Sequence, residues 1–240
     1  MGTLRPMPAA AILRRTAIGA VTTAALAVAG CGDGGAQVGA DRADQVRSAA
    51  LRAGLPDDVA SVLALAARAD DASFQVTYAG TDGARLVVSQ APPDRRIDVM
   101  QGDRVVESRV LRDRVAYRCA PDPAGATGEL RCSRAAGAIE PAGTFTDEAL
   151  RSFTDQLAAS KATLDVDVDT RKIAGVDATC LTSTPKAGTP LDGTGPGTDV
   201  LCLSAEGAQL LVDRDGDRLV ADRYTTEVPE GTFDVSASSR

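Results

Sequence analysis

The side chains in this chain that could do chemistry are cysteines, carboxylates and hydroxyls, because its 240 residues include five cysteines and no histidine. Without histidine the chain cannot build a Ser-His-Asp triad, a Cys-His pair or a histidine-ligated zinc, haem or copper site. These absences remove the most common hydrolase and metalloenzyme classes. We therefore expect a protein that is not an enzyme and that needs no cofactor.

Two acidic clusters resemble metal sites, and each has a simpler interpretation. Residues 213–217 open like a calcium-binding loop, but Gly216 is the fourth residue of the run, whereas that loop requires glycine at the sixth position. An Asp-Gly pair between two apolar runs predicts a hairpin turn instead. Asp165, Asp167 and Asp169 alternate with valines, which predicts the solvated face of a strand. We expect no metal at either place.

The overall charge makes nucleic acid an unexpected partner. The formal net charge is −7, and the aromatic residues are three tyrosines and four phenylalanines. Phosphate backbones require a basic surface, and single strands also require aromatic stacking platforms. The chain has neither.

The first thirty residues have the order of a secretory signal peptide. The basic residues at their start are Arg5, Arg14 and Arg15. Residues 17–29 follow as thirteen mostly apolar positions, fewer than the roughly 20 that a helix needs to cross a bilayer. We expect residues 1–30 to be a signal peptide rather than a membrane-spanning or buried helix.

One cysteine directly follows this segment. The sequence Val28-Ala29-Gly30-Cys31 resembles the bacterial lipobox, in which small residues precede the cleavage site and the cysteine thiol takes a diacylglyceryl group. We expect a lipoprotein that acyl chains on Cys31, palmitate among them, hold at the outer face of the cell membrane. The alternative is an ordinary secretory signal that happens to contain a cysteine. Residues 31–40 include four glycines and predict a flexible tether.

The other four cysteines predict structural disulfide bonds. They are Cys119, Cys132, Cys180 and Cys202. An exported domain permits disulfides, and four cysteines allow three connectivities. Proximity in sequence favours Cys119 with Cys132 and Cys180 with Cys202. A metal or redox site is the alternative, but the chain has neither a CxxC motif nor histidine.

Apolar periodicity predicts one α+β domain over residues 41–240. Thr146 is a candidate N-cap, and Gly54 is a candidate C-cap. The predicted helices are residues 41–53, 57–69 and 147–159. The predicted strands are residues 74–78, 86–90, 97–99, 105–111, 115–119, 164–171, 176–182, 200–203, 209–213 and 219–227.

This order of elements, together with several short motifs, resembles the LolA-like lipoprotein carriers and their actinobacterial lipoprotein relatives. The motifs are Phe74-Gln75-Val76-Thr77-Tyr78, Thr81-Asp82-Gly83, Ile173-Ala174-Gly175-Val176-Asp177-Ala178, Asp215-Gly216, Tyr224-Thr225-Thr226-Glu227-Val228-Pro229 and Gly231-Thr232-Phe233-Asp234. The resemblance covers most of residues 72–235. It implies a strongly curved antiparallel sheet, or half-barrel, with helices packed on its concave face. In several members of the family that face holds acyl chains.

The alternating strands supply candidates for an apolar cavity lining. They are Phe74, Val76, Tyr78, Leu86, Val88, Ile97 and Val99. A dry cavity on this face would suit a hydrophobic ligand, and a filled core is the alternative. We expect a non-enzymatic carrier or sensor of a lipid or acyl chain. The competing hypothesis is an envelope interaction or regulatory module that binds a protein partner and has no cavity.

Overall fold

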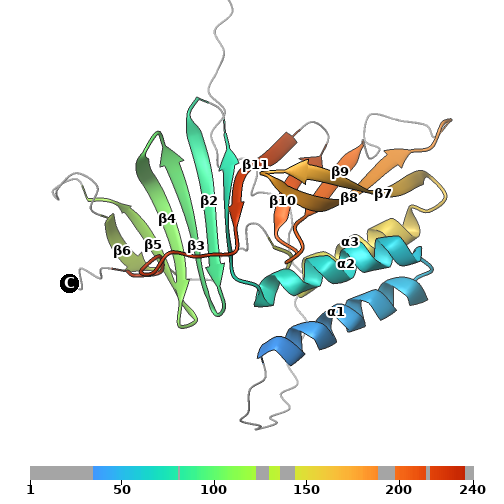
Figure 1. Cartoon of the computed structure of the whole chain (residues 1–240), viewed down its shortest axis with the longest axis horizontal. Coiled ribbons are helices and arrows are strands. Elements are labelled where there is room, and N and C mark those ends of the chain that lie inside the picture. The colour runs from blue at the N-terminus through green and yellow to red at the C-terminus, as the bar shows by residue number, and fades with distance from the viewer. Residues whose placement is uncertain are drawn as a thin grey trace, which may run out of the picture. The chain divides into compact units, whose positions relative to one another are not determined.

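The computed structural model describes residues 35–80, 82–122, 130–135, 144–188, 198–214 and 217–235 (Figure 1). The chain divides into the units Met1–Asp33 and Gly34–Arg240, and every described residue belongs to the second. The predicted signal peptide and Cys31 lie outside the described residues. Among those described, no helix has the length and apolar character needed to cross a membrane.

The first helix, α1 (Gly35–Arg52), begins earlier than the sequence predicts. Residues 35–40, which we expected to belong to the tether, are helical. Extending a helix that has already formed costs little per residue, so the alanines and the glutamine of this segment can join it. The end of α1 agrees with the prediction: Gly54 has φ of 75°, and the Leu55 N–H donates to the Ala50 carbonyl at 3.1 Å. This is the Schellman arrangement that favours glycine.

The other two helices agree closely with their predicted ranges. α2 (Asp57–Arg68) continues into the 3-10 turn η2 (Ala69–Asp71). α3 (Asp147–Ala159) begins after Thr146, whose hydroxyl accepts a hydrogen bond from the Ala149 N–H at 3.0 Å. This side-chain bond satisfies one of the free N–H groups at the start of the helix.

Within the described residues, eleven strands form one antiparallel sheet that is not closed (Figure 1). Its order is β6-β5-β4-β3-β2-β1-β11-β10-β9-β8-β7. The strands are β1 (Phe74–Ala79), β2 (Ala84–Ala91), β3 (Asp94–Gln101), β4 (Arg104–Arg112), β5 (Val115–Pro121), β6 (Leu130–Arg134), β7 (Leu164–Ile173), β8 (Val176–Pro185), β9 (Asp199–Leu203), β10 (Gln209–Arg214) and β11 (Asp217–Thr225). The predicted α+β class with a large antiparallel sheet is confirmed.

Sequence periodicity misses only β6 among these strands. Its residues are half-buried or exposed, so no alternating buried face marks it in the sequence. What holds β6 is its pairing with β5, in which Cys132 lies opposite Cys119.

Both predicted disulfides are present. Cys119 and Cys132 are register partners of β5 and β6 with an S–S distance of 2.04 Å. Cys180 and Cys202 are register partners of β8 and β9 with an S–S distance of 2.08 Å. Each bond therefore joins neighbouring strands at the base of a long connection.

Buried apolar residues form two clusters. The first joins the helices to β8 and β9, and it includes Val62, Leu63, Leu150, Leu181 and Leu201. The second joins β1 and β2 to β7–β11, and it includes Phe74, Val76, Tyr78, Val88, Cys180, Cys202 and Leu210. Val166 and Val168 of β7 pack against the first cluster, and the three aspartates that alternate with them are exposed. The predicted division of this strand into a packed face and a solvated face is confirmed.

Candidate functional site

The seven predicted lining residues share one face of β1, β2 and β3. In the sheet register Val76 lies opposite Val88, and Val88 lies opposite Ile97. Tyr78, Leu86 and Val99 form the neighbouring row. Directly opposed residues of antiparallel strands point to the same side, so we call this surface the β1–β3 apolar face.

Coverage of the β1–β3 apolar face decreases from β1 towards β3. Val76 and Val88 have 0% exposure, Ile97 has 8% and Val99 has 36%. The β1 end therefore belongs to the second buried cluster, whereas on β3 Ile97 is buried and Val99 is exposed to solvent. Whether an apolar ligand covers the open end remains a prediction.

At one end of this face, the next row of opposed residues has two polar side chains between two apolar ones. Phe74 lies opposite Gln90, Gln90 opposite Arg95, and Arg95 opposite Leu111 of β4. Gln90 and Arg95 flank the short connection between β2 and β3, which contains the cis Pro92-Pro93 peptide. Two polar side chains therefore end a face that is otherwise apolar.

An open cavity of about 380 Å³ lies at this row, and we call it the Gln90–Arg95 pocket. Its lining residues are Asp70, Gln90, Pro92, Pro93, Asp94, Arg95, Leu111 and Thr146. They come from η2, the end of β2, the Pro92-Pro93 connection, the start of β3, the end of β4 and the N-cap of α3. The volume falls within the range of about 300–1,000 Å³ that is usual for small-molecule sites.

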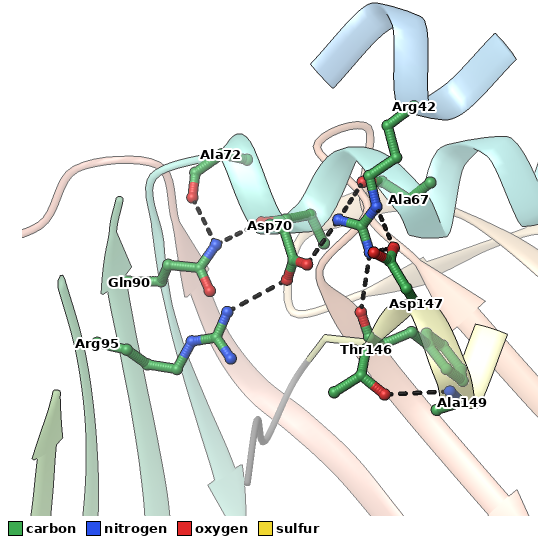
Figure 2. Close-up of polar contacts among 11 residues, drawn as sticks. Arg42, Ala67, Asp70, Ala72, Gln90, Arg95, Thr146, Asp147 and Ala149 are labelled. Atoms are coloured by element: carbon green, nitrogen blue, oxygen red, sulfur yellow. Dashed lines mark hydrogen bonds and ion pairs between the residues drawn. The ribbon is translucent and has the colours of Figure 1, made fainter. Parts of the chain in front are cut away.

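Gln90 contributes an unsatisfied hydrogen-bond acceptor to the pocket. Its Nε2 donates to the carbonyls of Ala69 and Ala72, the latter at 3.0 Å, which fixes the orientation of the amide (Figure 2). The residue is 1% exposed, and within the described part of the chain Oε1 has no hydrogen-bond partner. A buried acceptor without a donor costs about 1–3 kcal/mol. In Figure 2 this oxygen lies on the side of the amide that faces Arg95.

Asp70 lies between two arginines. Arg42 Nη1 is 2.5 Å from Asp70 Oδ2, and Arg95 Nη2 is 3.3 Å from Asp70 Oδ1 (Figure 2). Arg42 also donates to Asp147 Oδ1 at 2.7 Å and to the Ala67 carbonyl at 3.2 Å. Arg42 therefore ties α1 to the end of α2 and to the first turn of α3, and this holds Asp70 at the pocket wall.

The two arginines differ in how well their charge is compensated. Burial lowers the pKa of Arg42, but the charges and hydrogen bonds of Asp70 and Asp147 outweigh burial and leave this pKa raised. Burial also lowers the pKa of Arg95, and Asp70 alone does not restore it. Guanidinium groups remain protonated in proteins. Arg95 is therefore a cation whose lost hydration is only partly replaced by protein contacts.

The remaining polar groups of the pocket have partners. Asp94 Oδ1 accepts the Asp113 N–H at 3.0 Å, and the Thr146 hydroxyl caps α3. The pocket therefore offers a ligand the N–H donors of Arg95 and the free oxygen of Gln90, beside the remaining lone pairs of the Asp94 carboxylate and the hydroxyl proton of Thr146. Such an arrangement suits the binding and orientation of a polar group.

Sequence reasoning identified only Thr146 among the pocket residues, and only as a helix cap. The available signal was an interruption of the apolar alternation. Gln90 follows Leu86 and Val88 in the same phase of β2, and Arg95 precedes Ile97 and Val99 in β3. A polar residue in a buried phase is the informative kind of exception.

Comparison with known proteins adds no assignment. No protein-family model matches the chain, and no curated protein matches it. Within the described residues, no group of three or more cysteines, aspartates and glutamates is arranged to hold a metal ion.

Proposed function

We propose that this chain is an extracytoplasmic lipoprotein, anchored through Cys31, that carries or senses a lipid or acyl chain without altering its covalent bonds. One observation carries the proposal: the β1–β3 apolar face exposes Val99 on β3 and ends at a polar pocket at Arg95 of the same strand. An amphiphile has the same order of parts, because its acyl chain adjoins a polar head. We also propose that the chain is related to the LolA-like lipoprotein carriers that its sequence resembles.

We include a strongly curved half-barrel in this proposal. Some Cα atoms of β7 and β11 lie within 8 Å of each other, although β8, β9 and β10 separate these strands in the sheet. In a flat sheet the two strands would be about 19 Å apart, at about 4.8 Å per step. This closeness supports strong curvature in that part of the sheet. The cluster shared by the helices with β8 and β9 supports our placing the helices on the concave face.

In this proposal the acyl chain covers the exposed part of the apolar face at Val99. Burying apolar surface contributes about 25 cal/mol per Å², so a chain that covers this side chain gains affinity without any polar contact. The residues next to β3 on this side limit its extent, because Glu107 and Arg109 form an ion pair at 3.0 Å on β4.

Native mass spectrometry of the full chain tests the proposal. The Cys31→Ser variant, produced in the cells that make the protein naturally, removes the acyl anchor and leaves any carried lipid. We expect lipid masses bound to this chain. Val99→Arg should remove them, because it places a charge on the open apolar face. Val106→Arg is the matched control, since Val106 is similarly exposed and lies in the irregular register of β4 outside that face.

Two results would distinguish a lipid carrier from a module that binds an envelope protein. A ligand-free spectrum, together with no mass shift after addition of oleoyl lipids, would overturn the carrier proposal. Recovery of one specific envelope protein by cross-linking in cells, with no lipid, would favour the interaction module.

A further inference from the structure

The Gln90–Arg95 pocket requires a group that both donates and accepts hydrogen bonds. Oε1 of Gln90 is buried, has no donor within the described residues and lies on the Arg95 side of the amide (Figure 2). The Arg95 side chain is 14% exposed, and among the described residues its guanidinium donates only to Asp70, at 3.3 Å. A guanidinium has five N–H donors and no acceptor. A hydroxyl group can donate to Gln90 Oε1 and accept from the Arg95 guanidinium.

The charges around the pocket disfavour an anionic ligand. Two arginines, Arg42 and Arg95, are accompanied by three aspartates, Asp70, Asp94 and Asp147. A phosphate or carboxylate would meet this excess of negative charge and would compete with Asp70 for Arg95. An ammonium group has N–H donors and no acceptor, so it would leave the N–H groups of Arg95 without a partner.

We propose that the Gln90–Arg95 pocket is a subsite for an uncharged, hydroxyl-bearing group, held either as the head of a lipid or as a free polyol. The lipid form rests on the carrier function proposed above. The register supports it, because Val88 and Ile97 lie two residues from Gln90 and Arg95 on the same strands and the same face. Residues two apart on a strand are separated by about 7 Å. Val88 and Ile97 are buried, and the exposed member of the face is Val99, four residues from Arg95 on β3 and about 13 Å away. The acyl chain of a head group in the pocket therefore has to extend past Ile97 to reach Val99.

The test compares probes that share one oleoyl chain and differ in the head. They are 1-monooleoylglycerol, methyl oleate and 1-oleoyl-lysophosphatidate, with free glycerol as a fourth probe. Each is titrated below its critical micelle concentration against the full Cys31→Ser chain, with bound fractions read by native mass spectrometry. We expect monooleoylglycerol to bind at least about tenfold tighter than each of the other oleoyl probes, as one satisfied buried acceptor implies.

Each outcome bears on the hydroxyl subsite, on the carrier function or on both. Equal binding of the three oleoyl probes, or preference for lysophosphatidate, would overturn the hydroxyl subsite and leave the carrier function standing. Saturable binding of glycerol without binding of any oleoyl probe would support the subsite for a free polyol and overturn the carrier function. Absence of binding by all four probes would overturn both.

Two variants locate the preference in the pocket. Gln90→Met and Arg95→Met should each reduce the preference for monooleoylglycerol over methyl oleate to less than about twofold, because each removes one of the two hydrogen-bonding groups. Gln75→Met is the matched control, since Gln75 alternates with the apolar residues of β1 and its Nε2 donates to Ser89 Oγ at 2.8 Å outside the pocket. If Gln90→Met fails to fold, Arg95→Met decides. A preference that survives in Arg95→Met would overturn the assignment.

Discussion

Replacing Arg42 with methionine should destabilise the chain through the loss of one side chain that joins three helical segments. Arg42 Nη1 reaches Asp70 at 2.5 Å and the Ala67 carbonyl at 3.2 Å, and Nε reaches Asp147 at 2.7 Å. Methionine keeps most of the apolar stem and removes the charge and all of these donors. The variant therefore isolates the polar contacts.

The magnitude follows from how exposed each partner is. Asp70 is about two-thirds buried, so its charged hydrogen bond contributes about 1.5–3 kcal/mol. Asp147 is 70% exposed, and a pair of this kind contributes no more than about 0.5 kcal/mol. We therefore expect Arg42→Met to lower the free energy of unfolding by about 2–3 kcal/mol.

The same helix supplies a matched control. Arg47 pairs with Asp57 at 2.8 Å, but the two side chains are 45% and 69% exposed. Arg47→Met should cost less than about 0.5 kcal/mol, because solvent screens such pairs. Urea unfolding followed by far-UV circular dichroism measures both variants. A loss in Arg42→Met no greater than that in Arg47→Met would refute the assignment of Arg42 as the tie between these segments.

Two further predictions concern backbone space and alkaline pH. Gly207→Ala should lower the free energy of unfolding by about 3 kcal/mol or more, because a Cβ there would lie 2.1 Å from the Leu65 carbonyl oxygen. Gly175 has the same φ of 85° but open space around it, so Gly175→Ala should lower this free energy by only about 1 kcal/mol. Urea unfolding measures both variants. A similar loss in both would contradict the steric argument. Burial raises the pKa of both Tyr78 and Tyr224 above the ordinary value of 10. These tyrosines lose their protons at lower pH in the unfolded chain than in the folded one, so the free energy of unfolding should fall as pH rises above about 10. Replacing both tyrosines with phenylalanine should flatten this pH dependence. An unchanged slope would contradict the assignment to these two tyrosines.

Local signals explain what could be predicted. The range of α3 followed from an apolar stripe and the cap at Thr146, both of which act within one or two helical turns. The disulfide pairs followed from proximity, because each pair of cysteines brackets one connection between neighbouring strands. The start of α1 was missed, since its first residues are small and lack an apolar stripe that would mark them as helical.

Non-local contacts explain what could not be predicted. Gln90 appears in the sequence as one polar residue at the end of a strand, and its importance comes from the carbonyls of Ala69 and Ala72 that hold its Nε2. Arg95 acquires its setting from Asp70, which belongs to η2. Nothing near either residue in sequence specifies these partners.

By itself the sequence determined the α+β class, the three helices, ten of the eleven described strands and both disulfides, because each depends on periodicity, caps, turns or short separations. Only the tertiary structure decided that β11 inserts beside β1, where Val76 lies opposite Tyr224. It also decided that the apolar face of β1–β3 ends at a pocket. Pairing between strands so distant in sequence is selected by which faces bury together across the whole sheet, and that choice is not encoded in any one segment.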